Sequence, residues 1–140
     1  MLDTNVVVAL VRGNDLGRYL DATHQLTGST GKVALSVVSV GELFALANKF
    51  GWGATRRAQL SAILSAFPLI NLDAGIIAAY AEIDAASDAA GRPMGKNDVW
   101  IAATARVIDA TVLTTDRDFD HLHGVWVDRE WVDPDSRPGA

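Results

Sequence analysis

Four acidic residues of this chain lie at the end of an apolar segment or inside one, with no matching basic residue in the same segment. Burying a carboxylate without a positive partner is costly, so each of these positions needs a compensating cation. Carboxylate oxygens are hard ligands, and such ligands suit Mg²⁺ or Mn²⁺. The pattern predicts a divalent metal site with these four catalytic and metal-binding residues: Asp3, Glu42, Asp98 and Asp116.

Each acid also has a simpler explanation when it is considered alone. Asp3 and Asp98 could each cap the helix that follows, because an Asp at the N-cap accepts a hydrogen bond from a free backbone N–H. Glu42 could be a partly exposed residue, or it could pair with Lys49 or Arg57. None of these explanations accounts for the ordered set, so we favour the metal site.

The last of the four acids opens a short acidic run. Asp116 could simply close a turn beside its neighbour Arg117. Asp118 and Asp120 follow it at a spacing of two, which is more typical of a solvated turn. We therefore treat Asp118 as a secondary candidate ligand.

Other kinds of catalytic site have little support. The chain has no cysteine, which excludes a disulfide scaffold and a thiolate zinc site. His121 and His123 could hold a metal, but no HExxH-like spacing is present and surface histidines are the more ordinary explanation. Segment 91–96 has three residues between its glycines and is followed by Asn97, so it lacks the phosphate-loop pattern. No Ser-His-Asp or Cys-His arrangement competes with the acids.

Length and composition indicate one folded domain. The chain has 140 residues, of which 49% are hydrophobic, enough for a core. Its net charge of −5 weighs against non-specific nucleic-acid binding but is compatible with a metal-dependent enzyme acting on phosphodiesters. Neither a signal peptide nor an apolar run of about 18 residues is visible, so we expect a soluble, cytoplasmic protein.

Short apolar segments alternate with helical patterns along the chain. The segment 5–12 is compatible either with a strand or with a helix after an Asp-Thr-Asn cap. The alternation predicts an α/β fold with a central, mainly parallel sheet flanked by helices, in one domain over 1–132 followed by a flexible tail at 133–140. Strands are expected at 1–3, 32–36, 69–72, 111–114 and 125–127, a turn at 28–31, helices at 14–26, 38–50, 55–67, 73–90 and 97–108, and a short helix within 116–122.

The expected sheet explains how distant acids can meet. In an open parallel sheet, functional sites lie beyond the carboxyl ends of the strands. Asp3 and Asp116 follow strands directly, Asp98 begins a helix, and Glu42 lies about one turn into the helix after the second strand. We therefore expect all four at one edge of the sheet.

The order of these motifs resembles that of the PIN-domain ribonucleases, and most of all the VapC-type toxins of bacterial toxin–antitoxin pairs. The resemblance extends from Met1 to about Val127, and four motifs in order at family-like spacing are fairly specific. Family members usually have more apolar residues before the first Asp, so the length of the first strand is left open. The matching stretches are Leu2-Asp3-Thr4-Asn5-Val6, Ser39-Val40-Gly41-Glu42-Leu43, Asn97-Asp98-Val99-Trp100-Ile101-Ala102-Ala103 and Leu113-Thr114-Thr115-Asp116-Arg117-Asp118-Phe119.

The resemblance implies a PIN-like nuclease domain that hydrolyses RNA phosphodiester bonds with Mg²⁺ or Mn²⁺. It also implies a homodimer and inhibition by a small cognate antitoxin. Thr114 matches a hydroxyl that often supports the acidic set, and Asn5 matches the polar residue after the first Asp. The four acids named above match the family's acidic set.

Two alternatives and two surface features remain open. Some PIN-like domains are non-catalytic RNA- or protein-binding modules, and a response-regulator-like domain would need a downstream Lys at a strand end that is missing here. Arg92 and Lys96 flank Asp98 and are either RNA-backbone contacts or ordinary loop charges. Three aromatic residues near the loop between the two central helices could mark an interface or belong to the core: Phe50, Trp52 and Phe67.

Overall fold

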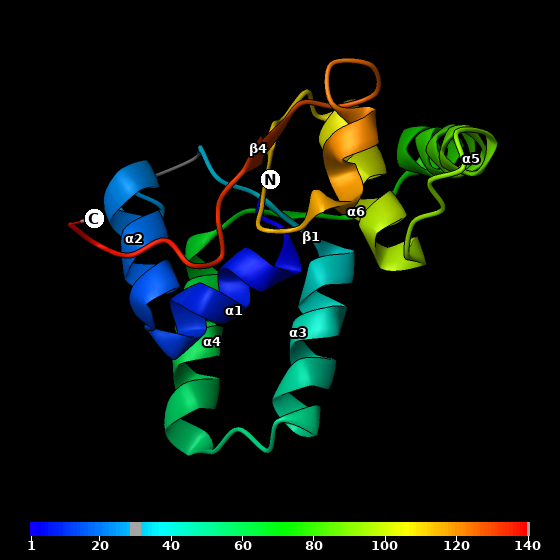
Figure 1. Cartoon of the computed structure of the whole chain (residues 1–140). Coiled ribbons are helices and arrows are strands. Elements are labelled where there is room, and N and C mark those ends of the chain that lie inside the picture. The colour runs from blue at the N-terminus through cyan, green and yellow to red at the C-terminus, as the bar shows by residue number, and fades with distance from the viewer. Residues whose placement is uncertain (29–31, 140) are drawn as a thin grey trace.

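A computed structural model of the chain describes residues 1–28 and 32–139. Helices surround a set of very short strands (Figure 1). The elements are α1 (Thr4–Arg12), α2 (Asp15–His24), β1 (Leu35–Ser36), α3 (Val37–Lys49), α4 (Ala54–Ala66), β2 (Leu69–Ile70), α5 (Ala74–Ala89), α6 (Lys96–Val107), β3 (Val112–Thr114), the 3₁₀ helix η1 (Arg117–Leu122) and β4 (Arg129–Trp131).

The N-terminus forms the central strand of a parallel sheet. On one side the Leu2 N–H donates to the Ala34 carbonyl at 3.1 Å, just before β1. On the other side the Asp3 N–H donates to the Leu113 carbonyl at 3.0 Å, and the Leu113 N–H donates to the Met1 carbonyl at 2.9 Å. The expected first strand is therefore present, and two apolar residues are enough to form it.

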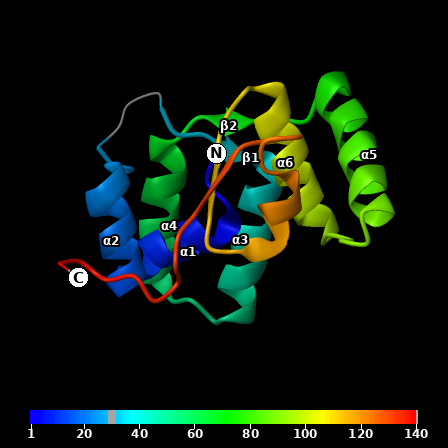
Figure 2. The ribbon, with the colours of Figure 1, turned by 45° about the horizontal axis from the view of Figure 1, so that its top comes forward.

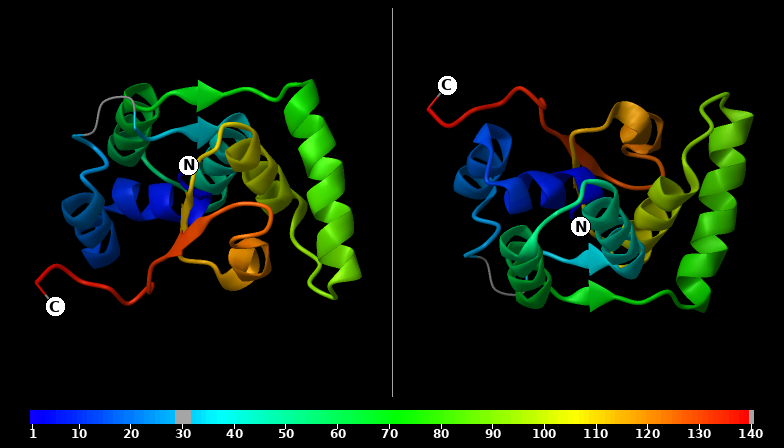
Figure 3. Two further views of the ribbon diagram at one scale, coloured as in Figure 1. Left: turned by 90° about the horizontal axis from the view of Figure 1, so that it is seen from above. Right: turned by 90° about the horizontal axis from the view of Figure 1, so that it is seen from below.

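The remaining strands extend this sheet on both sides. β1 pairs with β2 in parallel, with Leu35 opposite Leu69, and β3 pairs with β4 in parallel, with Val112 opposite Arg129. The hydrogen-bonded order is β2–β1–N-terminus–β3–β4 (Figure 3). The pairs β1–β2, Leu2–Leu113 and β3–β4 are all parallel, so the carboxyl ends of the strands lie at one edge. The predicted α/β class and parallel sheet are confirmed.

Capping residues determine where several helices begin. Asp3, Asn14, Ser36 and Asp73 each accept a hydrogen bond from the first turn of the helix that follows. The ambiguous segment after Asp3 is therefore helical, and it ends at Gly13 in the left-handed conformation (φ 59°). Helix α2 then packs closely on α1, since a Cβ at Gly17 would lie 2.1 Å from the Ala9 carbonyl oxygen.

Two apolar clusters fill the molecule on opposite sides of the central strand. One cluster joins α1, α2, α3 and α4, and the other joins α5, α6 and η1. Figure 2 shows the same separation, with α2 and α4 at one end and α5 at the other. In the described residues no helix is long and apolar enough to cross a membrane.

The last strand differs from the prediction. A strand was expected at 125–127, but the strand that pairs with β3 begins at Arg129. The N–H groups of Trp126 and Val127 both donate to the Leu122 carbonyl, at 2.9 and 3.2 Å. Those amides are occupied in a turn, and Val125 is left 72% exposed, so this short apolar run does not join the sheet.

Smaller differences concern lengths and aromatic residues. The strand expected at 32–36 is paired only at 35–36, and the turn expected at 28–31 lies partly outside the described residues. Trp52 and Phe67 are core residues, at 8% and 5% exposure, whereas Phe50 is 46% exposed. Of the three aromatic residues for which core and interface were left open, only Phe50 has an exposed surface.

Candidate active site

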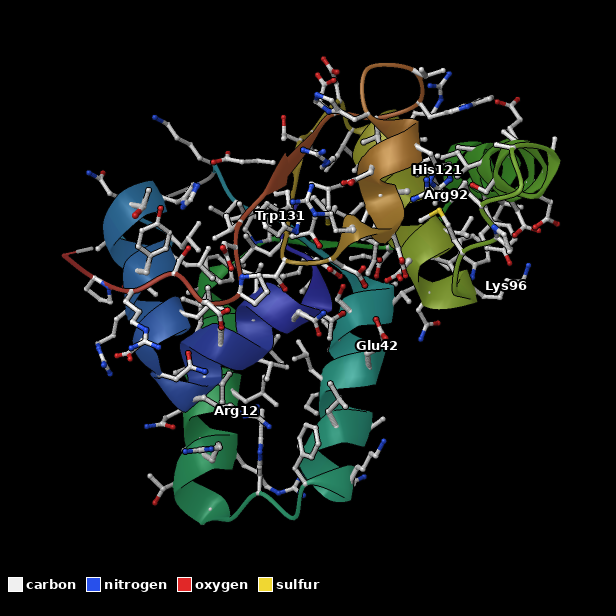
Figure 4. The ribbon with its side chains drawn as sticks, in the orientation of Figure 1. Arg12, Glu42, Arg92, Lys96, His121 and Trp131 are labelled. Atoms are coloured by element: carbon white, nitrogen blue, oxygen red, sulfur yellow. The ribbon has the colours of Figure 1, made fainter. Side chains whose placement is uncertain are left out.

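The carboxyl edge of the sheet brings the predicted acids together. Asp3 follows the central strand, and Asp116 comes two residues after β3 ends and caps η1. Glu42 lies in the second turn of α3, and Asp98 lies in the first turn of α6 (Figure 4 labels Glu42). The charge of each of the other three acts on Asp98, as the shift of its pKa described below shows.

Asp3 is the most deeply buried of these acids, at 3% exposure. Its Oδ1 accepts the Thr4 N–H at 2.7 Å, and its Oδ2 accepts the Thr114 hydroxyl at 2.7 Å. Burial raises the pKa of Asp3 to about 6, although both hydrogen bonds stabilise the carboxylate and oppose the rise. Asp3 is therefore both a helix cap, as in the simpler explanation, and a member of the acidic group.

Two hydroxyl groups connect the acids to one another. The Thr4 hydroxyl donates to Glu42 Oε1 at 2.7 Å, which joins α1 to α3. The Thr114 hydroxyl, besides donating to Asp3, accepts the Asp116 N–H at 2.9 Å. Thr114 thus joins Asp3 to the backbone of Asp116, and the bond from Thr4 to Glu42 was not anticipated from the sequence.

Asp98 lies among negative charges, and in the described part of the chain no group donates a hydrogen bond to its carboxylate. Burial raises the pKa of Asp98 to about 7, and the nearby charges of Asp3, Asp116, Glu42 and Asp118 add to the rise. Gly95, not Asp98, is the N-cap of α6, so the explanation of Asp98 as a simple cap is wrong.

Three of the carboxylates are close enough to share one ion. Asp98, Asp116 and Asp118 each offer an oxygen, and these oxygens lie within 4.8 Å of one another. Burial and the charge of Asp116 raise the pKa of Asp118. Oxygen ligands at this spacing fit Mg²⁺ or Mn²⁺, and a cation would relieve the repulsion that raises the pKa of Asp98.

The sequence model of the PIN domain matches residues 1–125. The chain belongs to the PIN-domain family. Its curated relatives include ribonuclease VapC2 of Haemophilus influenzae, 29% identical over 106 residues that cover 76% of this chain and 77% of the relative. The resemblance to VapC proteins seen in the motifs is thus confirmed.

Solved structures resemble this PIN domain over most of its length. The Neisseria gonorrhoeae FitAcB structure is 28% identical, with a TM-score of 0.69 and coverage of 84% of this chain and 87% of that one. The Rickettsia felis VapBC2 structure, bound to a promoter DNA fragment, is 23% identical with a TM-score of 0.77, covering 93% and 96%. At this lower identity the second likeness concerns the fold alone.

The remaining predicted residues of this PIN domain are placed differently. Asn5 is exposed and makes no side-chain hydrogen bond within the described residues, so it does not join the acidic network. Glu42 pairs with neither Lys49 nor Arg57, since Arg57 is bonded to the Trp52 and Ala47 carbonyls and to Asn48. Asp120 is not among the three acids that could share an ion, and it forms ion pairs with Arg117 and Arg129.

Sequence reasoning missed a polar group on the α5 side of the PIN-domain site. Ser87 is fully buried, and its hydroxyl is 2.8 Å from His121 Nε2. Figure 4 shows His121 and Arg92 close together beside η1. Ser87 lies in an alanine-rich helix and its partner is 34 residues away in the chain, so the local sequence does not indicate that the two side chains meet.

Proposed function

We propose that this PIN domain is a Mg²⁺- or Mn²⁺-dependent endoribonuclease and the toxin of a toxin–antitoxin pair. The observation that carries the proposal is the cluster of carboxylates around Asp98, whose pKa is raised to about 7 by burial and by the charges of the neighbouring acids. The names of its relatives, a ribonuclease VapC2 and structures of VapBC complexes, support the same activity.

The residues that would hold a divalent ion are Asp98, Asp116 and Asp118, with Asp3 and Glu42 completing the acidic surroundings. When bound, such an ion lowers the pKa of a coordinated water and offsets charge on a phosphodiester. The chain's own contribution is positional. Thr114 fixes the orientation of Asp3 and the backbone at Asp116, so the carboxylates are held in place before a ligand arrives.

An acidic pocket of this kind also suits a basic inhibitor. We propose that a small cognate antitoxin inserts a cationic side chain among the carboxylates, and that the toxin works as a homodimer on RNA in the cytoplasm. Replacing Asp3 and Asp98 together by Asn should weaken the antitoxin complex, as measured by titration calorimetry. An unchanged affinity would place the contact elsewhere.

RNA cleavage with Mn²⁺ present tests the catalytic proposal. We expect the wild-type chain to cleave a mixed-sequence RNA and Asp98→Asn to be slower by at least about 100-fold, the scale of losing one preorganised electrostatic group. Asp88→Asn is the matched control, because Asp88 is an exposed acid on α5. EDTA should abolish the wild-type cleavage.

The alternative is a non-catalytic PIN-like module that binds RNA or protein. It predicts no cleavage by the wild-type chain in Mn²⁺, and equal RNA or partner binding by wild type and Asp98→Asn. This pair of results would refute the nuclease and leave the fold assignment intact.

A further inference from the structure

One arginine beside the acidic group has no partner for its charge. In the part of the chain that the structure describes, the Arg92 side chain forms no hydrogen bond or ion pair, and the residue is exposed. Lys96, four residues later, forms an ion pair with Asp84 at 2.7 Å. Arg92 and Lys96 both precede Asp98 in the sequence, but among the described residues only the charge of Lys96 is paired.

Arg92 lies beside His121 of η1, the short helix that also carries Asp118 (Figure 4). Its charge opposes the rise in the pKa of Asp118, and it contributes to a lowered pKa of His121, whose largest cause is burial. Asp118 is one of the three residues whose oxygens lie within 4.8 Å of one another. Arg92 is thus a cation at the rim of an acidic pocket, on the α5 side (Figure 4).

Ser87 contacts both the backbone of Arg92 and the imidazole ring of His121. Its carbonyl accepts the Arg92 N–H at 2.9 Å, and its buried hydroxyl is bonded to His121 Nε2 at 2.8 Å. Between Ser87 and Arg92 the chain leaves α5 through Gly91, which has a positive φ of 68°. The end of α5 therefore holds Arg92 and η1, which carries Asp118, in one arrangement.

We propose that Arg92 binds a phosphate group of the RNA next to the scissile bond, and that Ser87 and His121 are positioning residues for it. This inference rests on the proposed nuclease function. A phosphate approaching several carboxylates meets repulsion, and a free cation at the rim would offset part of it and orient the RNA backbone. The planar guanidinium fork of arginine matches phosphate oxygens in geometry as well as in charge.

Lys96 is the matched control for this role. It has the same charge and lies in the same stretch before Asp98, but its ammonium is already bonded to Asp84. RNA binding by Lys96 would have to break that pair. The structure therefore selects Arg92 over Lys96 as the phosphate contact.

The test measures RNA binding at several salt concentrations in an Asp98→Asn background, so that the substrate stays intact. A fluorescent single-stranded RNA and anisotropy are suitable. Arg92→Ala should raise Kd several-fold and reduce the slope of log K against log salt by about 0.7, the value for one phosphate contact on a single strand. Arg92→Lys should keep most of the slope, and Lys96→Ala should change neither quantity.

A double-mutant cycle separates positioning from general stabilisation. Ser87→Ala should weaken RNA binding in the presence of Arg92 and have no further effect once Arg92 is Ala. The same non-additivity is expected for His121→Ala. If the Ser87 and Arg92 effects simply add, Ser87 contributes only to folding and the positioning role is wrong.

The outcomes distinguish this inference from the function on which it rests. If wild-type protein cleaves RNA while Arg92→Ala retains the Kd and the salt slope, the phosphate contact is refuted and the nuclease stands. If the wild-type chain neither binds nor cleaves RNA, the proposed function itself fails. Because Arg92 is exposed, its substitution is not expected to unfold the chain.

Discussion

The Thr114 hydroxyl donates to Asp3 Oδ2 at 2.7 Å across 111 positions of sequence. The Thr114 hydroxyl oxygen also accepts the Asp116 N–H at 2.9 Å, and Thr114 is fully buried. One side chain thus fixes the most buried carboxylate and the backbone of another acid. The hydrogen bond also stabilises the charged form of Asp3, against the effect of burial on its pKa.

Replacing Thr114 by Val should therefore damage both stability and activity. The change leaves the Asp116 N–H without its acceptor and Asp3 Oδ2 without its donor, at a cost of about 1–3 kcal/mol in the free energy of unfolding. The pKa of Asp3 should rise further, and RNA cleavage should fall. Thr111→Val is the control, since Thr111 is exposed in the same segment. Urea unfolding and a cleavage assay measure the two effects, and equal stability of the two variants would contradict the prediction.

Asp3 and Asp98 should respond in opposite ways to loss of their charge. Asp3→Ala removes the cap of α1 and the bond to Thr114, so we expect a loss of about 1–3 kcal/mol. Asp98→Asn removes a repelled carboxylate that has no hydrogen bond in the described residues, so the melting temperature should hold or rise.

Thermal melts in EDTA test this contrast. Both variants should lose RNA cleavage under the proposed function, which separates catalytic need from structural need. A large loss of stability in Asp98→Asn would show that its side chain has a structural role that its position in α6 does not suggest.

The stability of the metal-free protein should fall as the pH rises from about 4 to about 7. The pKa values of Asp3 and Asp98 are raised to about 6 and about 7, so the folded chain binds more protons than the unfolded chain in this range. The free energy of unfolding then decreases with pH through these two groups. Asp98→Asn should remove the part of this decrease that extends to about pH 7.

Urea unfolding of wild type and Asp98→Asn in EDTA, at about pH 5 and about pH 8, measures the difference. The gain in stability from the substitution should be larger at the higher pH. A gain that does not depend on pH would mean that Asp98 is not protonated in this range.

Local patterns predicted most of the fold because each helix carries its own signals. Asn14 and Asp73 were expected to begin helices, and both cap them. The last strand could not be predicted because Val125-Trp126-Val127 is an apolar run, whereas Arg129-Glu130-Trp131, which forms the strand, contains two charged residues. The choice is made by the Leu122 carbonyl, which takes two amides of the first segment into a turn.

Some residues of the candidate site could be identified from the sequence, and others could not. Its acids were identifiable because a carboxylate in an apolar segment is unusual in any protein. The hydroxyls that orient them were only partly identifiable, since Thr4 and Ser87 are ordinary residues whose partners lie 38 and 34 positions away. Asp118 was ranked as secondary because spacing alone cannot show that η1 turns its carboxylate toward Asp98.

Whether Asp118 binds metal can be decided by a Mn²⁺-induced shift in melting temperature. An ion that binds only the folded chain stabilises it by RT ln(1 + [L]/Kd), about 2.7 kcal/mol at 100 times Kd. If Asp118 is a ligand, Asp118→Asn should reduce the shift nearly as much as Asp98→Asn or Asp116→Asn. Glu82→Gln, an exposed acid on α5, should leave it unchanged.

The pH dependence of this shift supplies an independent check. Metal ligands must be deprotonated, so the Mn²⁺ effect should grow as the pH rises through the raised pKa of Asp98 at about 7. Asp98→Asn should flatten that dependence. If Asp118→Asn retains the full shift at about pH 8, the ion is held without it, and Asp118 acts instead beside the charge of Arg92.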